Sequence, residues 1–107
     1  MVNEVKYQDF AYNIGKVVKI RGKVAKEIWQ HMTTIINSHD NMEYFDMEEN
    51  YQIVVYSKDL ISRSGTVELT GELIKIEGKH KNPKSKIHDD FYEFQLIVDS
   101  WKEVEID

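Results

Sequence analysis

Positive charge is concentrated in one short stretch of a chain that is acidic as a whole. From residue 79 to residue 88 there is no carboxylate, and the cationic or titratable residues are Lys79, His80, Lys81, Lys84, Lys86 and His88. Over all 107 residues, 19 Asp and Glu outnumber 14 Lys and Arg, for a formal net charge of −5. Clustered lysines neutralise phosphates, so residues 79–88, here called the basic stretch, are the first candidate for contact with nucleic acid. The alternative is a loop whose lysines are only solvated.

Further cations and aromatic rings could extend such a contact, because bases stack on aromatic faces. Arg21 and Lys23 lie on the outward parity of an alternating stretch. The candidate stacking residues are Trp29, Tyr44, Tyr56 and Tyr92. Tyr44 and Tyr56 are favoured because their parity opposes that of Phe45, Met47, Ile53 and Val55. Phe45, Met47 and Phe94 are assigned to the core, and any single one of the candidate aromatic residues could also belong to it.

The residue types that support catalysis or metal binding are poorly arranged. His39–Asp40 and His88–Asp90 have neither helical nor zinc-type spacing, and the chain has no cysteine. Glu48 and Glu49 are consecutive, so on a strand they would point to opposite faces. We therefore expect no enzymatic activity, no cofactor and no metal site.

Length and composition limit the kind of protein this is. A chain of 107 residues with 41% apolar and 31% charged residues fits one globular domain, residues 1–107. The absence of cysteine excludes a disulfide framework. No apolar run is long enough to span a bilayer, so we expect a cytoplasmic protein without membrane contact. The net charge of −5 argues against non-specific coating of nucleic acid.

The pattern along the chain is mostly β. Alternation or apolar runs predict five strands, at residues 17–28, 44–47, 52–56, 66–76 and 91–106. Residues 33–41 begin β-like and end in turn residues. Residues 57–64 predict a helical connector of about two turns, which Gly65 ends. Residues 78–90 predict a long loop, and residues 2–14 fit either a short helix or an extended cap.

Two of the expected strands carry a glycine in the middle. Gly22 and Gly71 occupy equivalent places in GKVVKIRGKVAKEI and GTVELTGELIKIEG, with apolar residues at matching alternate positions. A glycine weakens a strand, so its presence needs a reason. A five-stranded sheet closes only if its longest strands bend sharply, and a glycine or bulge supplies that bend.

These features together resemble the OB-fold of the anticodon-binding and replication protein A type. The matching stretches, in chain order, are Gly15–Val24, Tyr44–Glu49, Ile53–Tyr56, Val67–Leu73 and an acid, Glu93, near the start of strand five. The resemblance spans roughly residues 15–104 and implies an all-β, five-stranded Greek-key barrel with a short helical connector or N-terminal cap. It departs from the family in a long loop between strands one and two, which carries Ile35 and Ile36, and in too short a segment for a full capping helix before strand four.

What the resemblance implies about function leaves two hypotheses. OB-folds bind single strands across strands two and three, between the loops that join strands one to two and four to five. The first hypothesis is therefore a non-enzymatic protein that binds single-stranded DNA or RNA through the basic stretch, Arg21, Lys23 and the exposed aromatic rings. The second is a protein–protein interaction subunit of a larger nucleic-acid-processing complex, favoured by acidic segments around residues 46–49 and 103–107.

Overall fold

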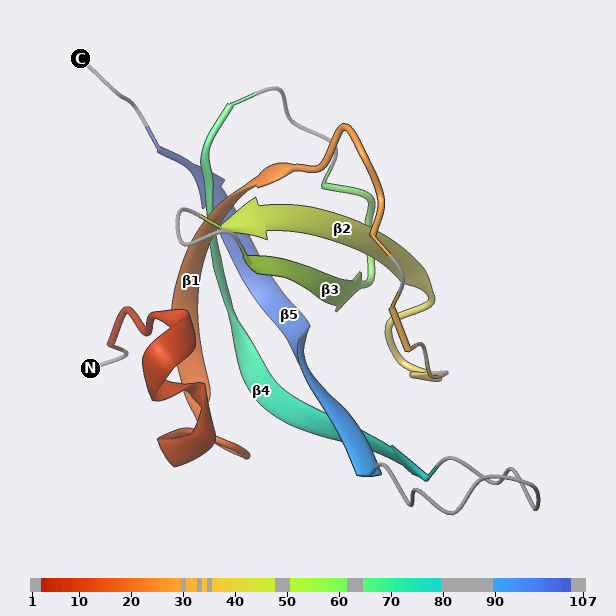
Figure 1. Cartoon of the computed structure of the whole chain (residues 1–107). Helices are drawn as coiled ribbons and strands as arrows, with labels where there is room; N and C mark the ends of the chain where they lie inside the picture. Colours follow the sequence, from red (N-terminus) through yellow and green to blue (C-terminus); the bar gives the residue numbers. More distant parts are fainter. Residues whose placement is uncertain are drawn as a thin grey trace.

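A computed structural model describes residues 3–29, 31–32, 34, 36–47, 51–61, 65–79 and 90–104. A short 3-10 helix, η1 (Tyr7–Tyr12), precedes five strands: β1 (Val17–Val24), β2 (Asn41–Met47), β3 (Tyr51–Ser57), β4 (Val67–Lys79) and β5 (Asp90–Glu103) (Figure 1). Of the predicted contact residues, Lys81, Lys84 and Lys86 lie outside the described residues. Lys79 ends β4, and its side chain is not described.

The five strands form a closed sheet in the order β1-β2-β3-β5-β4. All neighbours are antiparallel except β3 and β5, which pair in parallel through Val54–Gln95, Val55–Leu96 and Tyr56–Ile97. The mostly β architecture with five strands is confirmed. Of the two possibilities for residues 2–14, a short helix or an extended cap, the structure shows a short helix at Tyr7–Tyr12. Ahead of it, a bridge between Glu4 and Lys19 pairs the chain with β1.

The structure differs from the predicted elements in three places. β1 ends at Val24 rather than residue 28, and no helix forms in residues 57–61, the described part of the predicted connector. β4 and β5 pair as far as Lys79–Asp90, so part of the expected loop at residues 78–90 belongs to strands. Figure 1 shows these ends of β4 and β5 leaving the closed sheet as a two-stranded arm, at the lower right.

Gly22 lies where β1 changes partner. Residues Val17–Gly22 pair with β4, whereas Lys23 and Val24 pair with β2. A Cβ at Gly22 would lie 3.0 Å from the Asp46 carbonyl oxygen, so the absent side chain lets β1 turn closely against β2. The predicted bend in β1 is confirmed.

Gly71 lies at a close approach of β4 to β5. The register between these strands shifts between Thr70 and Gly71, and a Cβ at Gly71 would lie 2.0 Å from the Ile97 carbonyl oxygen. No side chain fits there without displacing backbone. The two glycine-centred stretches also pair with each other, antiparallel, so that Gly71 faces Val18 and Gly22 faces Val67.

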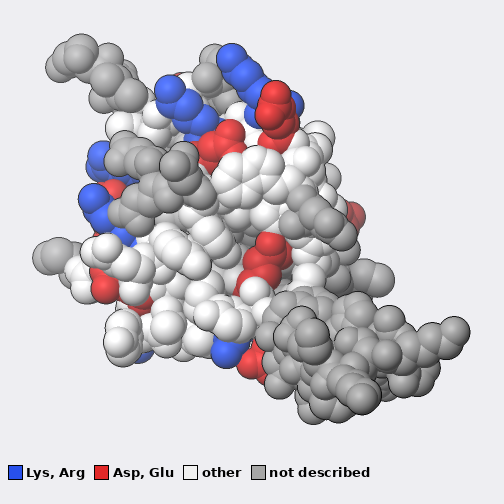
Figure 2. All heavy atoms as spheres, in the orientation of Figure 1, with Lys and Arg blue, Asp and Glu red and all other residues white. Residues whose placement is uncertain are grey.

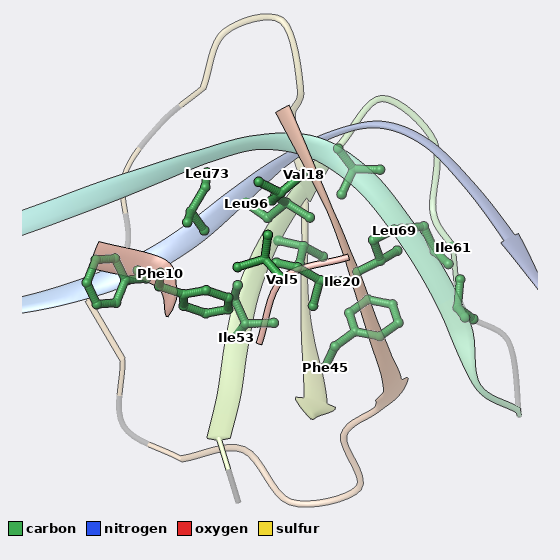
Figure 3. Close-up of a cluster of buried hydrophobic side chains, with 14 residues drawn as sticks. Val5, Phe10, Val18, Ile20, Phe45, Ile53, Ile61, Leu69, Leu73 and Leu96 are labelled. Atoms are coloured by element: carbon green, nitrogen blue, oxygen red, sulfur yellow. The ribbon is translucent and has the colours of Figure 1, made fainter. Parts of the chain in front are cut away.

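The core fills the inside of the closed sheet (Figure 3). Its largest fully buried apolar residues on the strands are Ile20, Phe45, Ile53, Leu69, Leu73 and Leu96. Phe10 of η1 covers one end and meets the rings of Tyr51 and Phe94 edge-on, with centroids 5.8 and 5.6 Å away. The assignments of Phe45 and Phe94 to the core are confirmed, and Met47 packs against it partly buried.

Candidate functional site

The outer face of β3 and β5 is covered by the chain itself. The connection between β1 and β2, of which residues 25–29, 31–32, 34 and 36–40 are described, is here called the covering segment. Gln52 and Tyr56 of β3 and Gln95 of β5 lie beneath it, each no more than 2% exposed. The prediction that Tyr56 offers an exposed ring is therefore wrong, because parity separates the two faces of a strand but does not show whether the outer face is covered.

Tyr56 is held by hydrogen bonds at its hydroxyl. The Tyr56 hydroxyl donates to Gln95 Oε1 at 2.6 Å and accepts from the Thr34 backbone N–H at 3.1 Å. Burial raises the pKa of Tyr56, opposed by the Thr34 N–H and reinforced by the charge of Glu93. The ring is a structural anchor for the covering segment.

Two glutamines complete the attachment. Gln52 Nε2 donates to the Glu27 carbonyl and to Asp46 Oδ1, and Gln52 Oε1 accepts from the Trp29 N–H, each at 2.8 Å. Gln95 Nε2 donates to the Met32 carbonyl at 2.5 Å and to Glu93 Oε2 at 2.6 Å. These bonds satisfy buried polar groups that would otherwise destabilise the fold.

The same partners orient the ring of His31. Because the Gln52 amide nitrogen faces two acceptors, its oxygen must face His31, and His31 Nε2 is the donor in that 2.8 Å contact. His31 Nδ1 in turn hydrogen-bonds Glu93 Oε1. Tyr44, half-buried, lies beside the ring with centroids 5.5 Å apart.

A groove opens on a different side, where β1 and β2 end and β3 begins. Its volume is about 720 Å³, and it brings together three predicted contact residues, Arg21, Lys23 and Trp29. Lys26, which the sequence analysis missed, also lines it. Trp29 is 49% exposed, and the bond of its backbone to Gln52 fixes its place at the edge.

The cations of this groove differ in how far they are engaged. Arg21 lies 3.4 Å from Glu68 and 3.7 Å from Glu4. Lys23 and Lys26 have no ion-pair partner among the described residues, although Glu27 and Asp46 also line the groove. In Figure 2, Lys and Arg side chains gather at the upper left, the side on which β1 and the end of β5 lie in Figure 1.

The remaining predicted residues lie elsewhere. Tyr92, on the two-stranded arm, is 58% exposed, and Lys75 Nζ lies 4.6 Å from its ring centroid. Lys79 ends the same arm. Arg21, Lys23 and Trp29 thus form one site, while Tyr92 and Lys79 belong to another part of the molecule. The signal for Lys26 was its position two residues after the end of β1, close in sequence to Lys23.

Comparison with known proteins adds no assignment. No protein-family model matches the sequence, and no curated protein matches it significantly. Within the described ranges, no three His, Cys, Asp or Glu residues are grouped so that they could hold a metal ion. The described residues also include no helix with the length and apolar character needed to cross a membrane.

Proposed function

We propose that the closed sheet is a Greek-key OB-fold. Three features support this: the strand order β1-β2-β3-β5-β4, the parallel pairing of β3 with β5, and the division of β1 between β4 and β2 at Gly22. They are the arrangement that the sequence resemblance implies. Fold alone does not fix function, so the functional proposal rests on the groove.

The protein binds single-stranded nucleic acid, DNA or RNA, in the groove at the ends of β1 and β2. The observation that carries this proposal is the gathering of Arg21, Lys23 and Lys26 around a groove with the half-exposed Trp29 at its edge. The lysines would neutralise phosphates, and the indole would stack on a base. The mechanism is non-enzymatic and uses no cofactor.

The groove differs from the binding face that the resemblance implied. The outer face of β3 is buried under the covering segment. The ligand therefore contacts the first residues of that segment, up to Trp29, rather than the outer faces of strands two and three. Lys79, the first residue of the basic stretch, ends the arm, whereas the groove lies at the end of β1; these are opposite sides of the molecule in Figure 1. The basic stretch and the groove can be tested separately.

The test is fluorescence anisotropy with labelled single-stranded DNA, single-stranded RNA and duplex DNA at two salt concentrations. We expect binding to the single strands that weakens as salt rises. The double variant Lys23→Gln with Lys26→Gln should bind more weakly. The triple variant Lys81→Ala, Lys84→Ala and Lys86→Ala should lose affinity independently of that double variant. Lys58→Gln, at an exposed position after β3, is the control. Undetectable or salt-insensitive binding at low salt would overturn the proposal.

A protein–protein subunit is the second candidate. The observation that favours it is a group of exposed apolar side chains beside the start of β1: Tyr12 is 79%, Ile14 43% and Val17 48% exposed. A partner chain would bury them. Light scattering of the purified protein, alone and after mixing with candidate partner subunits, separates the two functions. A strictly monomeric protein that binds oligonucleotide with nothing else present would exclude the second.

A further inference from the structure

The outer face of β1, β4 and β5 carries an ordered array of cations and hydroxyl groups. Register places Lys19, Thr70 and Ser100 in one row across the three strands. The next row is Arg21, Glu68 and Lys102. These six side chains alternate with Ile20 and Leu69 of the core and with Trp101, which packs against the core, so both rows face away from it.

Glu68 holds the cations of this array together. Its carboxylate, with the side chain only 8% exposed, lies 3.8 Å from Lys19 Nζ, 3.6 Å from Lys102 Nζ and 3.4 Å from Arg21 Nη2. Glu4 adds a second carboxylate at 3.7 Å from Arg21. In the ion pairs of the described residues, these three cations meet two carboxylates, Glu68 and Glu4.

Between the rows lies a hollow of about 310 Å³. It is lined by Lys19, Glu68, Thr70, Ser100, Trp101 and Lys102. The hydroxyls of Thr70 and Ser100, which face each other across β4 and β5, have no hydrogen-bond partner among the described residues. Two ammonium groups and two free hydroxyls around one hollow are donors for a tetrahedral oxyanion.

We propose that this hollow binds a phosphate group, held by Lys19 and Lys102 and by the hydroxyls of Thr70 and Ser100. The inference rests on the proposed function in one respect: the phosphate belongs to the backbone of the bound single strand. Arg21 lines the groove and also contacts Glu68 of the array, so the two sites are continuous. The backbone therefore runs from Trp29 past Arg21 onto the outer face of β1, β4 and β5.

The first experiment uses inorganic phosphate and the full chain, so it does not depend on nucleic acid. Amide NMR spectra are recorded during a phosphate titration, with sodium chloride of equal ionic strength as the reference. We expect saturable shifts at Thr70, Ser100 and Lys102, and their loss in the double variant Thr70→Val with Ser100→Ala. Absence of shifts at these amides, or equal shifts in the double variant, would overturn the phosphate site.

The second experiment asks whether that phosphate is part of a nucleic acid. The salt dependence of binding to a single-stranded oligonucleotide is measured for wild type, Lys102→Gln and the control Lys58→Gln. Loss of one phosphate contact should lower the slope of log affinity against log salt by about 0.7 and weaken binding about fivefold to tenfold at about 50 mM salt. The control should match wild type.

The outcomes separate the two claims. Phosphate shifts together with an unchanged slope in Lys102→Gln would overturn the backbone path and leave a site for free phosphate. A wild-type protein that binds no oligonucleotide would overturn the proposed function, and the phosphate titration would still decide the site. Shifts and a reduced slope together support the whole proposal.

Discussion

The closed sheet has two outer faces that use polar side chains in opposite ways. On β3 and β5, polar groups are buried beneath the covering segment and nearly all their donors and acceptors are paired within the chain: Gln52, Gln95 and Tyr56 are examples. On β1, β4 and β5, Lys19, Arg21 and Lys102 remain partly exposed around a single buried carboxylate.

The difference shows where a ligand has donors left to bind. Buried, mutually satisfied polar groups fix a structure and have little capacity for another partner. Exposed ammonium groups and unpaired hydroxyls can exchange water for phosphate oxygens with little rearrangement. The covered face thus has a structural role, since Gln52 positions Trp29. The open face carries the exposed cations.

Gly71→Ala should have the largest effect on stability, because it would disrupt the close approach of β4 to β5 on the open face. The added Cβ would lie 2.0 Å from the Ile97 carbonyl oxygen and 2.9 Å from Val98 Cα, which are backbone atoms that cannot rotate away. We expect a loss of about 3 kcal/mol or more in unfolding free energy, measured by urea titration. Gly22→Ala, whose nearest contact is 3.0 Å, should cost clearly less. Equal losses would contradict the close approach at Gly71.

Gln95→Ala should destabilise the covered face by about 2–3 kcal/mol, because it leaves the Met32 carbonyl and a carboxylate oxygen of Glu93 without their donor. The matched control is Ser100→Ala on the open face of the same strand, where a change within about 0.5 kcal/mol is expected. Chemical denaturation measures both. A similar loss in the two variants would remove the contrast between the faces.

Trp29→Ala should weaken binding of a single strand by about 1–3 kcal/mol, through loss of stacking, with little change in the salt dependence. Trp29→Phe should recover part of that loss. Anisotropy titrations at two salt concentrations measure both quantities. If Tyr92→Ala weakened binding while Trp29→Ala did not, stacking would have to be assigned to the arm.

Alkaline pH should destabilise the folded protein, with a smaller effect. Burial raises the pKa of Tyr51 and Tyr56 above 10, their value in the unfolded chain. The folded state therefore holds these protons more tightly, and its stability is present below pH 10 and falls as pH rises from there. Urea midpoints measured between pH 8 and about pH 11 test this, and Tyr56→Phe should show a shallower fall. A midpoint constant across that range would contradict the burial.

The sequence was a good guide to the closed sheet and a partial guide to the site. Alternation identified the strands, and the two glycines indicated the bends, because a strand interior tolerates glycine only for a reason of geometry. Arg21, Lys23 and Trp29 were predicted from outward cations and a ring near the end of β1, which are local signals, and the structure places all three around one groove.

What the sequence did not reveal depends on contacts between distant segments. The burial of Tyr56 comes from the covering segment, whose Thr34 lies 22 residues away along the chain. The segment is held by side-chain hydrogen bonds of Gln52 and Gln95. The array around Glu68 depends on strand register, which sets Arg21 opposite Glu68 and Glu68 opposite Lys102. Alternation gives the face of a residue but not its neighbours across the sheet.

An amide NMR titration with an unlabelled single-stranded oligonucleotide of about 12 nucleotides tests whether the ligand lies on the open side of the sheet. We expect the largest shifts at residues 21–29 and 100–102. Shifts concentrated at Val54–Tyr56 and Gln95, or no shifts at all, would contradict this expectation.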